Sequence, residues 1–135
     1  MEKDNLIIYK NKEGEVIVDA IYQDETLWLT MKGMAKVFDV QVPAISKHLN
    51  NIFEEGELDK NSTVSKMEIV RKEGNRIVTR EIEFYNLDAI IAVGYRVNSR
   101  KATEFRIWAT KILKEYMLKG FALNDEKFIR GNKYC

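Results

Sequence analysis

The side chains with the clearest chemical use lie between residues 41 and 51, where amides, an ammonium and a hydroxyl recur at helical spacing. Gln and Asn can each bond an adenine edge in two places, and Lys can reach guanine acceptors or a phosphate. A small apolar side chain can lie against a thymine methyl. The stretch therefore predicts a set of candidate DNA-contacting residues, which are Gln41, Val42, Ala44, Ser46, Lys47, Asn50 and Asn51.

A second group of basic residues flanks the "KEGN" turn signal at residues 72–75. Cations on a hairpin can hold phosphates, which fixes the position of a protein on a duplex without reading its sequence. The alternative is that charges on an edge strand prevent one sheet from pairing with another. The residues of this predicted phosphate-binding arm are Arg71, Lys72, Arg76 and Arg80.

Groups for catalysis are missing from the chain. His48 is the single histidine and Cys135 the single cysteine, so neither a two-histidine zinc site nor a Cys–His nucleophile pair can be assembled. We expect His48 to be a partly buried helix residue or a phosphate contact. Phosphate-loop and nucleophile-elbow motifs are also absent from the sequence. The residues therefore predict no enzyme, no cofactor and no small-molecule substrate.

The elements that must position the first group are two short helices within residues 29–53. Thr30 is a good N-cap, and the apolar residues after it recur at helical spacing. Pro43 falls in the first turn of the second helix, where a missing N–H costs nothing and a fixed φ helps. The predicted inward faces consist of Met31, Met34, Ala35 and Phe38 in the first helix and Ile45, Leu49, Ile52 and Phe53 in the second.

The spacing of this pair fits a helix-turn-helix unit. Such a unit has a small residue in the first helix, a left-handed residue followed by a hydrophobe in the turn, and a β-branched hydrophobe in the second helix. Those places hold Ala35, Asp39, Val40 and Ile45. Asp39 replaces the commoner glycine, and Gln41 is a poorer N-cap than Ser or Thr.

The other segments predict an α+β domain. Residues 1–30 alternate β-branched runs with turn residues, which predicts a hairpin and a short third strand. Residues 62–85 predict a second hairpin that turns at Gly74, and the helical part covers 86–120. Its first helix is expected to start at Asn86, and its second is expected to run from a Ser99 cap to a stop at Gly120. The apolar stripe of that last helix, a core or dimer face, comprises Phe105, Trp108, Ala109, Ile112, Leu113, Tyr116 and Met117.

Length and composition limit the classes of protein to which the chain can belong. With 135 residues and 45% hydrophobic side chains, the chain is expected to form one domain spanning 1–135. It shows no long apolar stretch, so the prediction is a cytoplasmic protein without a membrane partner. A formal net charge of +1 does not by itself indicate a nucleic-acid partner. Any such function must therefore depend on local clusters of charge.

Two stretches resemble the N-terminal region of RhuM-type virulence proteins, which are found in bacterial genomes and mobile elements. They are "LWLTMKGMAKVFDVQVPAISKHLNNIFEEGEL" and "REIEFYNLDAIIAVGYRVNSRKATEFRIWATKILKEYMLKGFALNDE". More distantly, "EFRIWATKILKEYMLKG" is similar to the end of the phage and viral Bro-N DNA-binding domain. The resemblance covers residues 5–127 and implies a DNA-binding or regulatory role. It also implies that this chain is the N-terminal domain of a longer protein.

The residues and the resemblance together predict a winged helix-turn-helix-like domain that binds double-stranded DNA. The second short helix would enter the major groove and the basic hairpin would lie on phosphates. We expect a homodimer, because one short helix contacts too few base pairs for a specific site. The alternative is a protein-interaction or oligomerisation module without nucleic-acid binding. In that case exposed apolar residues of the last helix, Leu118 or Phe121, would carry the function.

Overall fold

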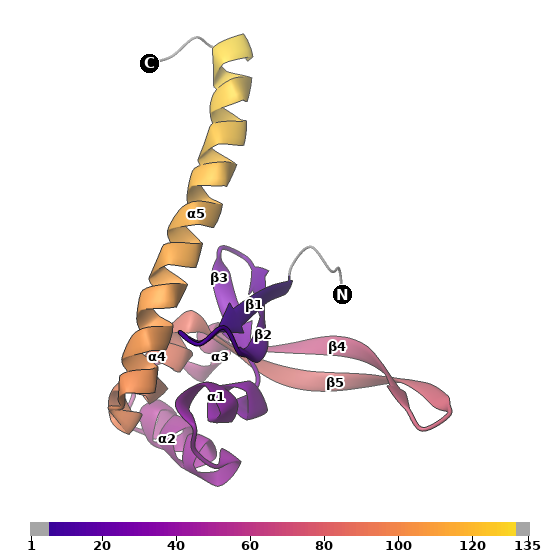
Figure 1. Cartoon of the computed structure of the whole chain (residues 1–135), viewed down its shortest axis with the longest axis vertical. Helices are drawn as coiled ribbons and strands as arrows, with labels where there is room; N and C mark the ends of the chain where they lie inside the picture. The colour runs from indigo at the N-terminus through magenta and orange to yellow at the C-terminus, as the bar shows by residue number, and fades with distance from the viewer. Residues whose placement is uncertain (1–5, 132–135) are drawn as a thin grey trace.

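A computed structural model describes residues 6–131, with side chains described as far as Leu118. The fold is a mixed α+β arrangement, which confirms the predicted class (Figure 1). In chain order the elements are β1 (Leu6–Lys10), β2 (Val16–Gln23), β3 (Thr26–Leu29), α1 (Met31–Phe38), α2 (Val42–Glu54), α3 (Lys60–Thr63), β4 (Val64–Glu73), β5 (Arg76–Asn86), α4 (Leu87–Val97) and α5 (Arg100–Gly131).

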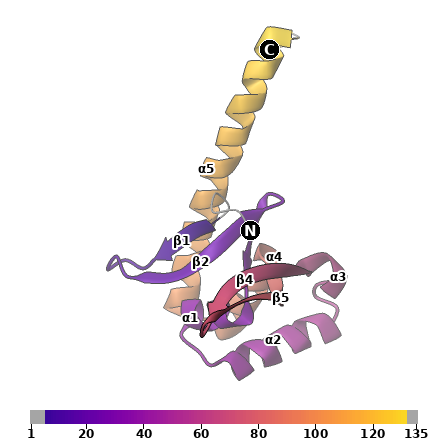
Figure 2. The same ribbon diagram turned by 90° about the vertical axis from the view of Figure 1, so that its right-hand side faces the viewer.

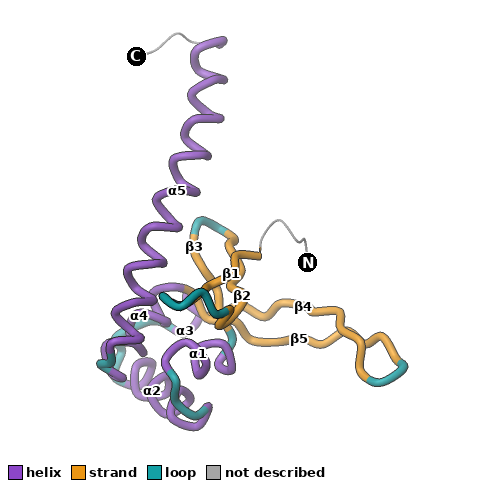
Figure 3. The backbone as a smooth tube through the Cα atoms, in the orientation of Figure 1, coloured by secondary structure: helices purple, strands orange, loops and turns teal. Residues whose placement is uncertain are grey.

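All five strands belong to one antiparallel sheet, in the order β1-β2-β3-β5-β4. The two predicted hairpins therefore join, through two residue pairs between β3 and β5, Trp28 with Asn86 and Leu29 with Tyr85. β4 and β5 stay paired from Val64–Tyr85 out to Glu73–Arg76. Most of this β4–β5 hairpin consequently projects from the domain, and its tip lies far from the helices (Figures 1 and 3).

Local signals account for the starts of the helices. The Thr30 hydroxyl accepts a hydrogen bond from the Gly33 amide at 3.0 Å and so caps α1. The Asn86 side chain accepts from the Ala89 amide at 3.2 Å and caps α4 in the same way. Both caps confirm the sequence-based predictions. Gly74 also adopts the positive φ, +65°, that the tip of the β4–β5 hairpin was expected to need.

The main core lies between the helices and one face of the sheet. Phe105 of α5 is 1% exposed and forms its centre, with ring centroids 5.1 Å from Tyr9 and 6.2 Å from Phe38. Trp108 packs beside it, with its ring centroid 5.5 Å from that of Phe105. These aromatic contacts attach the first turns of α5 to β1 and α1.

A smaller apolar cluster lies at the base of the projecting hairpin. Met67 and Phe84 of the hairpin pack with Ile21 and Trp28 of β2 and β3, and all four are buried. The Trp28 indole N–H also donates to the Gln23 carbonyl oxygen at 2.9 Å. This cluster holds the hairpin in a fixed direction relative to the domain, although only two residue pairs join β5 to β3.

Two expectations are corrected, and one short helix had not been expected. α5 does not stop at Gly120 but continues to Gly131, since one glycine costs a helix only about 1 kcal/mol and stops it only in a capping conformation. Met117, expected on the inward stripe, is 53% exposed. The neighbouring Tyr116 still packs on Tyr22 of β2, with ring centroids 4.7 Å apart, so Met117 lies on the other side of the helix at this level. Beyond it, α5 extends away from the domain (Figures 1 and 2). The short helix α3 was not predicted, and its four residues are too few to show periodicity.

Candidate nucleic-acid interface

The polar face of α2 is open to solvent because its apolar face is fixed inside the domain. Ile45, Leu49 and Ile52 are at most 1% exposed, as the periodicity predicted. Figure 2 shows α2 at the lower edge of the domain, below β4 and β5. Of the predicted contact residues on and beside it, Gln41, Val42, Lys47 and Asn50 are exposed, whereas Ala44, Ser46 and Asn51 are half-buried.

The turn before α2 has the geometry that the spacing predicted. Asp39 adopts a left-handed conformation, φ +57°, and its backbone N–H bonds the Ala35 carbonyl oxygen. Ala35 is buried in the core, and Val40 packs against the core. Asp39 is thus left-handed and Ala35 and Ile45 are buried, while the helix-turn-helix assignment of the pair stays a prediction.

Ion pairs lie just beyond both ends of α2. Before the helix, the Asp39 carboxylate lies 3.3 Å from the Lys101 ammonium of α5. After it, the Arg96 guanidinium of α4 donates to Glu55 at 2.8 Å and to Glu57 at 3.1 Å. Sequence reasoning missed these pairs, because residues so far apart in the chain carry no local signal. Arg96 and Lys101 thus contact carboxylates of the same chain, and the hydrogen bonds to Glu55 and Glu57 raise the pKa of Arg96.

The N-cap position of α2 is the weak point of this helix. Gln41 has the extended backbone of an N-cap, but its side chain makes no capping hydrogen bond. We expect Gln41→Ser to raise the free energy of unfolding by about 0.5–1 kcal/mol, because a hydroxyl at this place can accept a free amide of the first turn. Urea unfolding followed by circular dichroism measures the change. Gln41→Ala is the control, and an equal gain in that variant would contradict the capping explanation.

The register of the hairpin sorts its charges onto two faces. Opposite residues in an antiparallel pair share a face, and Arg71 lies opposite Val78 while Ile69 lies opposite Arg80. Consequently one face, called here the arginine face, carries Arg71, Arg76 and Arg80. Lys72 lies on the reverse face. All four predicted phosphate-contact residues are exposed, but the structure brings only the three arginines together.

One carboxylate lies among these arginines. The two oxygens of Glu73 accept hydrogen bonds from the Arg80 guanidinium at 2.8 and 3.2 Å, and Arg71 Nε lies 3.6 Å from Oε2. The hydrogen bond from Arg80 lowers the pKa of Glu73 below its usual value, and Glu73 in turn raises the pKa of Arg80. Sequence reasoning counted the cations of this arm and overlooked Glu73.

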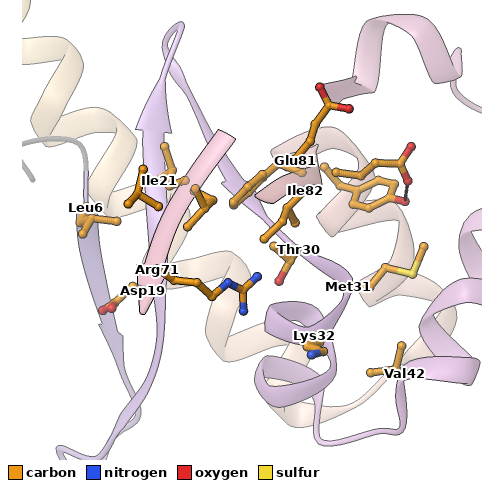
Figure 4. Close-up of a pocket in the computed structure, with 15 residues that line it drawn as sticks. Leu6, Asp19, Ile21, Thr30, Met31, Lys32, Val42, Arg71, Glu81 and Ile82 are labelled. Carbon is orange, nitrogen blue, oxygen red and sulfur yellow. Dashed lines mark hydrogen bonds between the residues drawn. The ribbon is translucent and has the colours of Figure 1, made fainter. Parts of the chain in front are cut away.

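An open groove of about 950 Å³ lies between the hairpin and the start of the helix pair (Figure 4). Arg71 extends into it from β4 toward Thr30 and Lys32 at the start of α1. Val42, at the start of α2, lines the same groove. One residue from each predicted contact group therefore borders this space. The lining residues are Leu6, Asp19, Ile21, Thr30, Met31, Lys32, Val42, Ile69, Val70, Arg71, Glu81, Ile82, Glu83, Phe84 and Tyr85.

Tyr85, on the wall of this groove, makes stability depend on alkaline pH. Burial, with a further contribution from Glu83, raises the pKa of its phenol to about 12. In the unfolded chain a tyrosine ionises near pH 10. The folded state therefore keeps the proton that the unfolded state releases. The stability that this phenol contributes is complete below pH 10, and it is lost as pH rises toward about 12.

Tyr85→Phe isolates this effect. We expect the free energy of unfolding of the wild type to fall relative to that of Tyr85→Phe by up to about 2 kcal/mol between pH 9 and pH 12. Urea unfolding of both proteins across this range measures the difference. If the difference between the two free energies of unfolding did not change with pH, the prediction would be contradicted.

In the described part of the chain, His48 and possible metal or membrane-spanning elements were the other candidates for a function. His48 is half-buried on α2, in line with the first of its two predicted roles. Among the side chains that the structure describes, no group of three or more from His, Cys, Asp or Glu could hold a metal ion. No helix within the described residues combines the length and apolar character needed to cross a membrane.

Comparison with known families adds one finding. The model of the virulence protein RhuM family matches residues 62–134, more than half of the 135-residue chain. The matched residues include the β4–β5 hairpin, α4 and α5, and they do not include α1 and α2. Searches of curated proteins and of solved structures returned no match. The similarity to the Bro-N domain stays a prediction.

Proposed function

The chain belongs to the virulence protein RhuM family, and on that premise we propose that it is a DNA-binding domain of winged helix-turn-helix type. In this proposal the exposed face of α2 enters the major groove, and the arginine face of the β4–β5 hairpin lies on the phosphate backbone. The protein acts without catalysis, as a regulator-like binding module.

The order of the elements supports the winged-helix assignment. β3 is followed by the α1–α2 pair and then by the β4–β5 hairpin, and β3 pairs with β5 rather than with β4. The chain thus returns from the helix pair to the same sheet and projects a hairpin beside the second helix. A wing formed in this way can reach the backbone next to the groove that the helix occupies.

The strongest support for the proposal is the exposed polar side of α2. Lys47 and Asn50 are exposed on α2, three residues apart and so on one side of the helix, while Ile45 and Leu49 hold the opposite side in the core. Base-reading side chains must be rigidly presented, because a small displacement breaks a two-bond contact.

The decisive experiment is a fluorescence-anisotropy titration with random and selected duplexes across a salt series. The selected duplexes come from enrichment of bound oligonucleotides out of a random pool. We expect affinity to fall steeply as salt rises, because each phosphate contact releases condensed counterions. Undetectable affinity for any duplex at low salt, or an affinity that does not change with salt, would overturn the proposal.

The second candidate is self-association or protein interaction through α5. It has a specific observation in its favour, since Ile107, Met117 and Leu118 are between 53% and 68% exposed on that helix. Phe121, the other residue expected to matter, lies outside the described side chains. Light scattering of the wild type and of Leu118→Glu tests this candidate. It predicts a larger wild-type mass that the variant loses, and DNA binding as a dimer is compatible with that outcome.

A further inference from the structure

In the free protein, the carboxylate of Glu73 already occupies the arginine face of the hairpin. Glu73 lies on β4 directly opposite Arg76, and therefore on the same face as Arg71 and Arg80. Both of its oxygens are bonded by Arg80, in the two-bond geometry that an arginine also uses toward a phosphate. An open hollow of about 460 Å³ adjoins this pair and is lined by Glu73, Arg76, Val78, Thr79 and Arg80.

The reverse face of the same hairpin has a different composition. Lys66 and Lys72 share it with Glu68, Glu81 and Glu83. Glu68 and Glu81 lie directly opposite each other, an arrangement of like charges that weakens a strand pair. A phosphate backbone would thus meet mixed and partly repulsive charge on this side, and three arginines with one carboxylate, Glu73, on the other.

Resting on the proposed DNA-binding function, we propose that Glu73 is an internal competitor for the phosphate backbone. In the free protein its carboxylate bonds Arg80 and lies near Arg71, where a backbone phosphate would otherwise bind. A duplex must displace this carboxylate before both guanidinium groups can contact it. The hydrogen bond from Arg80 lowers the pKa of this carboxylate.

The competition has a specific consequence for affinity. Phosphate contacts supply the sequence-independent part of protein–DNA affinity. Glu73 therefore weakens binding to every duplex by the same factor and leaves the ratio between selected and random duplexes unchanged. It also lowers the number of counterions that binding releases, and hence the slope of affinity against salt.

Glu73→Gln tests the proposal, because it removes the charge and keeps the size of the side chain. We expect affinity at low salt to rise about three- to fivefold for selected and random duplexes alike, the upper part of the range that an exposed ion pair allows. We also expect the salt slope to steepen by about one phosphate contact. Anisotropy titrations measure both, and circular dichroism verifies that the variant is folded.

Glu68→Gln is the matched control, since it changes the net charge equally but lies on the reverse face without an arginine opposite it. We expect less than a twofold change in this variant. Equal gains in both variants would mean that only net charge acts, and no gain in Glu73→Gln would mean that its carboxylate does not compete. Either result overturns this inference while leaving DNA binding intact. A wild type that binds no duplex instead overturns the proposed function and this inference with it.

Discussion

Replacing Lys47 and Asn50 together by alanine is expected to reduce the preference for a selected duplex over a random one by about 2–4 kcal/mol. Both side chains are exposed on the same side of α2, and the helix beneath them is held by buried Ile45 and Leu49. Each well-formed contact with a base contributes about 1–3 kcal/mol of discrimination. Anisotropy titration of both duplexes at one salt concentration measures the loss.

The chain offers a control of the same residue types. Lys60 and Asn61 are exposed on α3, outside the helix pair. Lys60→Ala combined with Asn61→Ala removes the same groups from another surface, and we expect the preference to stay within experimental error. Equal losses in the two double variants, or no loss from changing Lys47 and Asn50, would exclude α2 as the reading helix. The second outcome would favour the interaction-module candidate.

Phe105→Ala is expected to lower the free energy of unfolding by about 3–5 kcal/mol, the usual cost of removing a buried phenyl ring. The side chain is 1% exposed, and its ring contacts Tyr9, Phe38 and Trp108. Its loss leaves a cavity where α5 meets β1 and α1. Because domains of this size are stable by only about 5–15 kcal/mol, the loss is a large share of the total.

Ile107→Ala is the control for this prediction. Ile107 belongs to the same helix and lies two positions away, but it is 65% exposed. Surface substitutions of this kind change stability by about 0.5 kcal/mol or less. Urea unfolding of the two variants measures both effects. A small loss from Phe105→Ala, or an equal loss from Ile107→Ala, would contradict the packing described for α5.

If the Lys47 and Asn50 variant binds weakly while remaining as stable as the wild type, recognition and folding reside in separate residues. The inward face of α2 determines where the helix lies, and its outward face is free to vary. This separation would allow the target sequence of the domain to change without loss of the fold. The hairpin arginines would keep the general affinity in such variants, because phosphate contacts do not depend on base sequence.

Local signals in the sequence predicted every element except α3, and most of the ends of these elements. Thr30 and Asn86 cap their helices through their own side chains, and Gly74 supplies the conformation of a tight turn. Such features depend on neighbouring residues only, so they can be read from short stretches. The periodicity of α2 likewise predicted its buried residues, Ile45, Leu49 and Ile52. The predicted end of α5 at Gly120 was wrong, because a single glycine is a weak stop signal.

By itself, the sequence determined the α+β class, the helix pair with its inward and outward faces, and the presence of a basic hairpin. Only the tertiary structure decided that β3 joins β5, that three arginines share a face with Glu73, and that ion pairs with α4 and α5 form near the ends of α2. The physical reason is distance along the chain. Caps and periodicity come from residues a few positions apart, whereas strand register and ion pairs join residues that only the folded chain brings together.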